Sequence, residues 1–428
     1  MAVVKPFRAT MYAHKNVDIS ELTAPPYDVI DTAQREALLA SDPHNVVALE
    51  LPDGAMDASI PGNRYETGAA SWAQWHADGA LAEDDQPAIY VVEQTWLHEG
   101  SPICRRGFIG AVELQPFSAG VILPHERTLP KAIADRLELT RACKANLSQV
   151  FGLYSDPQGV TDRAFEAVES TDPIMTATDA AGVLSRVWAI RDAGTIARLA
   201  AFLEPKQVYI ADGHHRYTTA LAYRDECRAA ADPATAGGDP AYDFVMMMLV
   251  NMDDPGLLVL PTHRVARVDG VVDAEAFWEA LAVDFDLAEV SGTAADALAG
   301  VTAPAFVVKT ASGEMRLASL KADSDPSERI ATQHGADWKR LDVAVLQELV
   351  LKPILGIHPD EPATLERLSF IKDATQALTV PGGDVAFILR ATRMDQLRAV
   401  ALSGEVMPQK STYFYPKLLS GLLMRPLS

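Results

Sequence analysis

The chain has 428 residues, of which 48% are hydrophobic and 22% charged, and these values exclude global disorder and allow two to four domains. Its 58 acidic and 37 basic residues give a net charge of −21, which argues against binding to nucleic acid or to an anionic membrane. Cys104, Cys143 and Cys227 are too far apart for a metal or redox motif. We therefore expect no disulfide, no structural metal and a cytoplasmic location. No apolar run reaches the ~18–20 residues of a membrane span.

The first 61 residues contain recurrent prolines, which favour extended chain and short strands over long helices. One helix is predicted over 31–42, with Asp31 as its N-cap. A second is predicted over 65–81, ending near Gly79. Two period-two runs follow, at 88–96 and 105–114, and they predict an antiparallel hairpin.

Helical and strand-like segments alternate through the rest of the chain, which predicts a mixed α/β fold. The pattern changes near residue 265, so we expect a first domain over 1–265 and a second, smaller α/β domain over 266–428. Helices are predicted at 129–146, 194–204, 274–285, 343–355 and 393–404, strands at 149–156, 243–254 and 385–391, and a hairpin at 305–320.

The segment VYIADGHHRYTTALAY, residues 208–223, predicts a strand, a tight turn and a helix. The strand should cover 208–211, with Asp212 as N-cap and a helix that begins by His215. Gly213 would let a ligand approach the backbone closely. The free amides at the helix start favour phosphate, and His214, His215 and Arg216 add further donors. The alternative is a polar surface turn.

Two other segments carry polar groups suited to phosphoryl chemistry. In LPHERT, residues 123–128, Glu126 could be a general base or a favourable residue at a helix start. The metalloprotease spacing H-E-x-x-H fails because residue 129 is leucine. Near the C-terminus, Lys410, Ser411 and Thr412 offer one charge and two hydroxyls, although no P-loop precedes them.

A weaker group of candidates lies at strand ends and in proline-rich chain, and each member is more readily explained as a structural residue. Basic residues outnumber acidic ones within 122–146 and within 405–428, and local cationic patches of this kind suit a small anionic ligand such as a nucleotide. The possible substrate-binding residues are Arg8, Tyr27, Asp28, His125, Arg127, His263 and Arg264.

Several motifs together resemble one protein family. The chain is identified as a member of the DUF1015 family on the stretches PFRA, APPYDVI, LPHERTLPKAIADRLELTRACKANLSQVFGLYSD, ADGHHRYTTAL, LPTHR and MPQKSTYFYPKL. The order of its P-H-E, D-G-H-H-R and Lys-Ser-Thr elements is also similar to free-serine kinases of the ParB/sulfiredoxin-like superfamily. That resemblance implies a ParB/sulfiredoxin-like mixed-sheet core with a helical insertion.

The kinase resemblance also implies an activity, the phosphorylation of free L-serine or a similar metabolite. ADP or ATP would be the phosphoryl donor, and Mg²⁺ would bind together with the nucleotide. Glu126 would be the catalytic base, and Asp212 would help deprotonate the hydroxyl or hold Mg²⁺. The nucleotide phosphates would bind to Gly213, His214, His215 and Arg216, and Lys410, Ser411 and Thr412 would bind substrate or phosphate. This sequence departs from the kinases in the long stretch between Glu126 and Asp212 and in the aromatic run 413–415.

We expect the C-terminal segment 405–428 to return to the first domain, so that Glu126, the turn 212–216 and Lys410 line one pocket. Two other activities are compatible with the same motifs: a ParB-like nucleotide-binding switch, and a phosphatase that uses the same turn. A sulfiredoxin-like reductase is disfavoured because no cysteine lies in the D-G-H-H-R segment.

Overall fold

The computed structural model describes residues 1–13, 18–231, 238–268, 273–379 and 384–427. The chain divides into two compact units. Unit 1 comprises Met1–Pro124, Thr128–Leu258 and Pro416–Ser428, and unit 2 comprises His125–Arg127 and Val259–Tyr415. The assignment of residues 1–265 as a catalytic domain stays a prediction. The mixed α/β class predicted from the sequence is confirmed.

Unit 1 is built on a mixed sheet, which has nine strands in the described part of the chain. Its central strand, β12 (Phe244–Asn251), is buried at every residue, as expected for a strand that is covered on both faces. The predicted hairpin of β4 and β5 is confirmed and pairs antiparallel. The sheet order is β6 (Ile122–Leu123), β11 (Val208–Asp212), β8 (Val150–Tyr154), β12, β5 (Ser101–Glu113), β4 (Ile89–His98), β10 (Leu184–Ile190) and β9 (Met175–Thr178), with β1 (Val4–Lys5) added beside β5.

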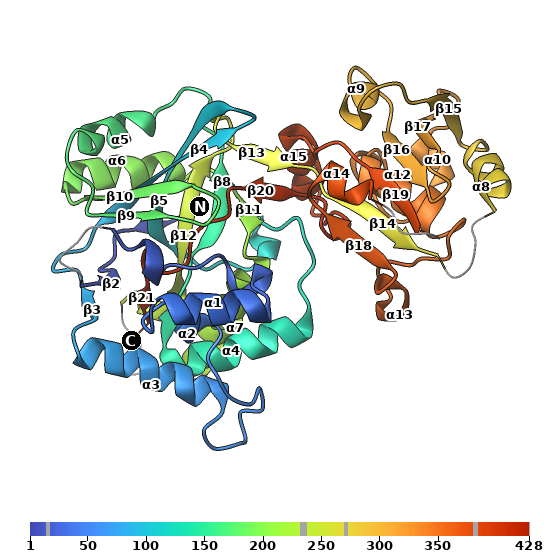
Figure 1. The fold of residues 1–428 in the computed structure, drawn as a ribbon. Coiled ribbons are helices and arrows are strands. Elements are labelled where there is room, and N and C mark those ends of the chain that lie inside the picture. Colours follow the sequence, from blue (N-terminus) through green and yellow to red (C-terminus); the bar gives the residue numbers. More distant parts are fainter. Residues whose placement is uncertain (14–17, 232–237, 269–272, 380–383, 428) are drawn as a thin grey trace. The chain divides into compact units, whose positions relative to one another are not determined.

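The helices of unit 1 begin and end largely where the sequence places them. Helix α1 (Thr32–Ser41) starts at Asp31, whose carboxylate accepts from the Gln34 amide in a capping box. Figure 1 shows α3, α4 and α7 near one another, and α4 packs against both α3 and α7. The other bounds are α2 (Val47–Glu50), α3 (Arg64–Ala77), α4 (Pro130–Cys143), α5 (Asp162–Glu169), α6 (Ala193–Leu203) and α7 (His214–Ala230).

The C-terminal residues of the chain are part of unit 1. Gln149 Nε2 donates to the Leu419 carbonyl at 3.0 Å, and Arg425 donates to the carbonyls of Phe244 and Ala241. The strand β21 (Arg425–Pro426) pairs with β7 (Ala145–Asn146). These contacts fix the segment that carries Lys417 beside β8 and β12. A small two-stranded sheet of β2 (Thr10–Tyr12) and β3 (Leu81–Glu83) completes the unit.

Unit 2 is built on an antiparallel sheet, which has six strands among the described residues. The rings of Phe285, Phe306 and Phe387 pack edge to face in its core. The sheet order is β15 (Phe285–Glu289), β17 (Met315–Leu320), β16 (Ala305–Thr310), β19 (Asp384–Ile388), β14 (His263–Arg267) and β18 (Leu368–Ile371). A separate pair is formed by β13 (Leu258–Leu260) and β20 (Tyr413–Tyr415).

The helices of unit 2 are short. The expected helix at 343–355 is only partly α-helical, because α12 (Asp342–Leu346) continues as a π-helical turn over Gln347–Leu351 before Pro353. The others are α8 (Ala274–Leu281), α9 (Ala294–Leu298), α10 (Pro326–Arg329), α11 (Ala336–Lys339), α13 (Pro362–Leu365), α14 (Ala374–Ala377) and α15 (Met394–Leu402).

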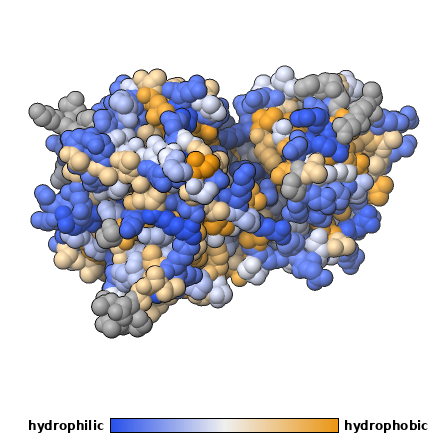
Figure 2. Space-filling view, turned by 90° about the horizontal axis from the view of Figure 1, so that it is seen from below, coloured by the Kyte–Doolittle hydropathy of each residue, from blue (hydrophilic) through white to orange (hydrophobic). Residues whose placement is uncertain are grey.

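Within the described ranges, every helix is too short or too polar to cross a bilayer. Figure 2 shows a face on which hydrophilic and hydrophobic residues are interspersed.

Candidate functional site

The turn that the sequence singled out joins β11 to α7 in unit 1. The strand ends at Asp212, Gly213 has a left-handed φ of +85°, and the helix begins at His214. The predicted strand, turn and helix are therefore confirmed. The predicted N-cap is wrong, because Gly213 occupies that position and no side chain caps the helix. Asp212 lies one residue before the N-cap, and its carboxylate binds two cations.

Those two cations are Arg216 and Lys417. Arg216 Nη2 lies 2.7 Å from Asp212 Oδ2, and Lys417 Nζ lies 2.5 Å from Asp212 Oδ1. Burial alone would raise the pKa of Asp212, but the two cations outweigh it and lower that pKa to about 2. The carboxylate is thus held ionised, with an excess of one positive charge over the three side chains.

Lys417 was not among the residues predicted for the site, although its motif was recognised. Its backbone is held by two buried residues of the β4–β5 hairpin. Arg105 Nη2 donates to the Pro416 carbonyl at 2.7 Å, and Gln94 Nε2 donates to the Lys417 carbonyl at 3.5 Å. Arg105 is completely buried, and burial lowers the pKa of its guanidinium to about 9. Local sequence gives no sign of this support, because residues 94 and 105 lie more than 300 positions from 416.

The two histidines and the arginine of the turn have distinct surroundings. Burial lowers the pKa of His214 to about 3, so its imidazole is neutral at physiological pH. His215 Nε2 accepts a hydrogen bond from the Leu129 amide at 2.9 Å, which joins the starts of α4 and α7. Arg216 Nη1 donates to the Gln149 carbonyl. These side chains brace the turn, and the amides at the start of α7 remain its most direct phosphate donors.

His125 and Glu126 of the P-H-E element belong to unit 2, where His125 contacts the segment before β20. The amide of Met407 donates to the His125 carbonyl at 2.9 Å, and His125 Nε2 lies 3.0 Å from Thr412 Oγ1. His125 and Glu126 lie in irregular chain, since α4 begins only at Pro130. The view of Glu126 as a helix-start residue is therefore wrong.

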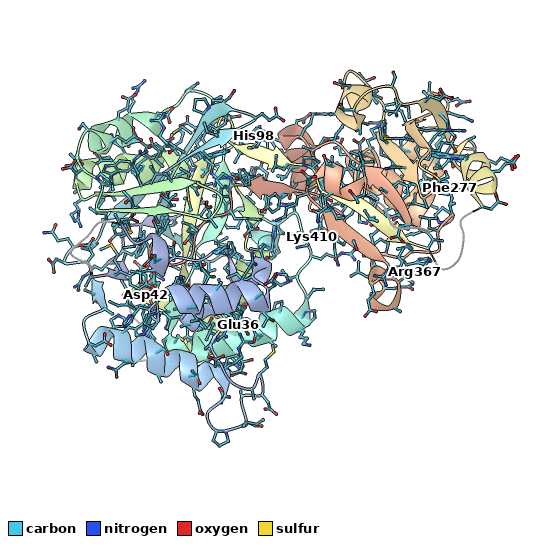
Figure 3. The ribbon with its side chains drawn as sticks, in the orientation of Figure 1. Glu36, Asp42, His98, Phe277, Arg367 and Lys410 are labelled. Atoms are coloured by element: carbon cyan, nitrogen blue, oxygen red, sulfur yellow. The ribbon has the colours of Figure 1, made fainter. Side chains whose placement is uncertain are left out.

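The Lys410-Ser411-Thr412 segment is anchored within unit 2. Arg264 Nη2 donates to the Gln409 and Lys410 carbonyls at 3.1 and 3.0 Å, and Lys410 has a left-handed φ of +55°. Ser411 is buried and its hydroxyl donates to the Pro408 carbonyl. Lys410, labelled in Figure 3, is exposed. Arg264 is thus a buried structural support for this segment.

The remaining candidates have structural contacts of their own. Arg8 Nε donates to the Asp84 carbonyl at 2.7 Å and pairs with Glu83. His263 is buried in β14, where its Nδ1 accepts from the Leu389 amide and burial lowers its pKa to about 4. Asp28 is exposed. The Tyr27 ring lies over the Arg136 guanidinium, whose Cζ is 4.4 Å from the ring centroid. Arg127 Nη1 forms an ion pair with Asp360 Oδ1 at 3.3 Å.

The sequence-predicted site residues therefore fall into two groups. Asp212, Gly213, His214, His215 and Arg216 meet in unit 1, together with Lys417. Glu126, His125 and the segment 410–412 belong to unit 2. The expected common pocket for Glu126, the turn and Lys410 stays a prediction.

Comparison with known protein families identifies the chain. The family model described as "Protein of unknown function (DUF1015)" matches residues 4–344. The chain belongs to the DUF1015 family. The match includes the P-H-E, D-G-H-H-R and L-P-T-H-R motifs and ends before the Lys-Ser-Thr segment. No curated protein matches the sequence.

Several solved structures are similar at a low level. A free serine kinase variant in complex with ADP is 14% identical with a TM-score of 0.34, over 69% of this chain and 84% of that one. A conserved hypothetical protein from Pyrococcus furiosus is 14% identical with a TM-score of 0.32, over 70% and 89%. SbnI from Staphylococcus aureus, truncated at its C-terminus, is 12% identical with a TM-score of 0.35, over 74% and 87%. A functional assignment therefore has to come from the residues of this chain.

Proposed function

We propose that the protein is a nucleotide-dependent phosphotransferase. It transfers a phosphoryl group from ADP or ATP to the hydroxyl of a small metabolite, with free L-serine as the first candidate. The observation that supports this proposal is the β11–Gly213–α7 turn, where an ionised Asp212 is held between Arg216 and Lys417 at the start of a 17-residue helix.

The turn has the chemistry that a phosphate group requires. The first amides of α7 have no partner within the helix, and the helix dipole makes that end positive. Gly213 has no Cβ, and the Arg216 guanidinium packs into the space that a Cβ would take, so a phosphate at this turn would meet that cation. Lys417 and Arg216 supply more positive charge than Asp212 removes. Phosphoryl transfer depends mainly on positioning and on neutralising phosphate charge, and this turn offers both.

The acceptor hydroxyl needs a base, and Glu126 is the proposed one. A carboxylate that accepts the hydroxyl proton in the transition state typically contributes about 10²–10⁴-fold to the rate. Asp212 is less suited to this role, because its pKa of about 2 makes it a weak base. We therefore assign Asp212 to the ordering of Lys417 and Arg216.

The carboxylate of the turn is a poor ligand for Mg²⁺. Arg216 and Lys417 already bind both oxygens of Asp212, so this carboxylate does not fit as a metal ligand in the observed arrangement. In the ranges that the structure describes, no group of three or more His, Cys, Asp and Glu side chains could hold a metal ion. The entry of Mg²⁺ with the nucleotide stays a prediction.

The direct test is product identification. Purified protein is incubated with ADP or ATP and L-serine, and then with a metabolite pool, and new phosphorylated products are identified by mass. The proposal predicts a phosphate monoester of an added metabolite and a stoichiometric loss of nucleotide. Release of inorganic phosphate alone would favour the hydrolase alternative, and consumption of neither nucleotide would reject the proposal.

The role of Glu126 is tested by a matched pair of substitutions. Glu126→Gln keeps size and polarity but removes the base, so turnover should fall by about 10²–10⁴-fold while nucleotide affinity stays at the wild-type value. Glu36→Gln, on the exposed surface of α1 (labelled in Figure 3), should change neither quantity. Wild-type turnover in Glu126→Gln would remove Glu126 from the mechanism.

A further inference from the structure

Unit 1 contains a small, partly open cavity lined by charged, polar and apolar side chains, most of which have no role in the proposed function. It lies between α4 and α7, and residues of α2, β7 and β12 form the rest of its wall. Its volume is about 50 Å³, room for roughly four water molecules or one small ion. The lining residues are Glu50, Arg136, Leu139, Thr140, Ala145, Asn146, Leu147, Ser148, Arg216, Thr219, Ala220 and Val245.

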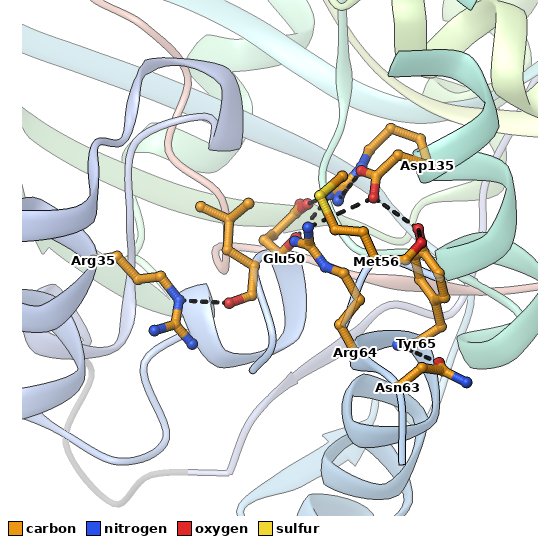
Figure 4. Close-up of polar contacts among 9 residues, drawn as sticks. Arg35, Glu50, Met56, Asn63, Arg64, Tyr65 and Asp135 are labelled. Atoms are coloured by element: carbon orange, nitrogen blue, oxygen red, sulfur yellow. Dashed lines mark hydrogen bonds and ion pairs between the residues drawn. The ribbon is translucent and has the colours of Figure 1, made fainter. Parts of the chain in front are cut away.

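The charged wall of the cavity is a buried ion-pair network. Arg136 Nη1 lies 3.4 Å from Glu50 Oε2 and 2.8 Å from the Glu50 carbonyl. Nη2 of the same guanidinium forms an ion pair with Asp135 Oδ2. The other oxygen of Asp135, Oδ1, lies 3.6 Å from Arg64 Nη1. Figure 4 shows Glu50, Arg64 and Asp135 of this network. Glu50 and Arg136 are about 95% buried, so their charges are poorly screened by solvent.

Two lining residues carry oxygen atoms whose hydrogen-bonding capacity is unused. Glu50 Oε1 and Thr219 Oγ1 are buried and have no hydrogen-bond partner among the described residues. Buried polar atoms are nearly always paired, and each one left unpaired costs about 1–3 kcal/mol. A carboxylate oxygen can only accept, so the missing partner of Glu50 must be a donor. The Thr219 hydroxyl can donate or accept.

The balance of charge around the cavity favours an anion. Arg216 lines it from α7 and is connected through Asp212 to Lys417. Three charged side chains line the cavity, Glu50, Arg136 and Arg216, so its wall carries one more positive than negative charge. The partners of these residues do not change that excess, because Asp135 is paired with Arg64 and Asp212 with Lys417.

We propose that this cavity binds a small oxyanion that carries a proton, such as hydrogenphosphate or bicarbonate. The hydroxyl of the anion donates to Glu50 Oε1, and its ionised oxygens accept from the guanidinium groups and from the Thr219 hydroxyl. Sulfate has a similar size and charge but carries no proton near neutral pH. It would place an oxygen lone pair against the Glu50 carboxylate, so the cavity discriminates against it.

The proposal is independent of the phosphotransferase assignment. It requires no nucleotide, and of the lining residues only Arg216 also belongs to the turn. Because phosphate could also bind at the start of α7, the test must report on Glu50 and Thr219 themselves.

The experiment is a calorimetric titration of the full chain with inorganic phosphate, bicarbonate and sulfate, each measured separately. Wild-type protein should bind phosphate or bicarbonate roughly 10–100-fold more tightly than sulfate. This ratio corresponds to the cost of leaving Glu50 Oε1 buried without a donor when sulfate is bound. The tighter of the two protonated anions identifies the ligand. In Glu50→Gln the amide can donate to sulfate, so the preference for the protonated anion should disappear or reverse.

A second pair of variants keeps the test valid if Glu50→Gln fails to fold. Thr219→Val removes an unpaired hydroxyl, so it should leave stability without anion unchanged or higher, and weaken phosphate and sulfate by a similar factor of roughly 2–10. Thr10→Val removes another buried, unpaired hydroxyl that does not line the cavity, and it should leave anion binding unchanged. Equal affinity of the wild type for phosphate and sulfate, wild-type anion affinity in Thr219→Val, or no binding of any anion would overturn the proposal.

Discussion

Replacement of Lys417 by methionine tests the electrostatic arrangement of the turn. Methionine keeps most of the side-chain volume and removes the ammonium group that lies 2.5 Å from Asp212 Oδ1. Asp212 then stays largely buried, and of its two cationic partners only Arg216 remains. Its pKa must rise, because burial opposes ionisation and half of the compensation is gone.

The magnitude follows from the pKa of Asp212. In the wild type that pKa is lowered from 3.8 to about 2, so the carboxylate stabilises the folded state by about 1.8 × 1.36, or about 2.4 kcal/mol, at neutral pH. This stabilisation is fully present above pH 3.8 and is lost as the pH falls toward 2. If the pKa in Lys417→Met returns to 3.8, the variant loses about 2.4 kcal/mol at pH 7 and only about 1.3 kcal/mol at pH 3.

The assay is urea unfolding of both proteins at a series of pH values from 7 to 3. The difference in unfolding free energy between wild type and variant should shrink as the pH falls. Lys5→Met serves as the control, because its ion pair with Asp239 is exposed and should contribute less than about 1 kcal/mol. An equal loss at pH 7 and pH 3 in Lys417→Met would show that Asp212 is not stabilised by this lysine.

Two further substitutions test how the turn is built. Gly213→Ala should lower the unfolding free energy by more than the roughly 1–2 kcal/mol that left-handed backbone strain costs, because the new Cβ would also lie 2.8 Å from Arg216 Nε. Gly79→Ala is the control. Gly79 also has a left-handed φ but, among the described residues beyond its chain neighbours, has no atom within 4 Å of the new Cβ, so this variant should show the strain alone. Arg105→Met should lower the unfolding free energy by about 1–3 kcal/mol, because it leaves the Pro416 carbonyl and Gln94 Oε1 without this donor. Urea unfolding at pH 7 measures both, and wild-type stability in Arg105→Met would show that Arg105 does not hold the Lys417 segment.

The elements with strong local signals could be predicted from the sequence. The apolar strand before Asp212, the glycine after it and the alanine-containing helix predicted the β11–α7 turn. Asp31 is the N-cap expected at the start of α1, and alternating apolar residues predicted the β4–β5 hairpin. Each of these signals lies within about 25 residues of chain.

The features that were missed depend on contacts between distant residues. Lys417 reaches Asp212 across 205 positions, and Arg105 reaches Pro416 across 311. The buried pair of Glu50 and Arg136 is also invisible locally, because α2 and α4 are brought together by the fold. A buried arginine has the same local pattern as an exposed one, so burial had to come from the structure.

The proposed phosphotransferase activity requires that the β11–Gly213–α7 turn binds the phosphates of a nucleotide. Calorimetric titration of ADP and ATP into wild type, Gly213→Ala and Gly79→Ala tests it most directly. The account predicts that at least one nucleotide binds the wild type and Gly79→Ala equally well, and binds Gly213→Ala at least roughly tenfold more weakly, as expected for the loss of one charge-assisted phosphate contact. Absence of nucleotide binding by the wild type, or wild-type affinity in a folded Gly213→Ala, would contradict it.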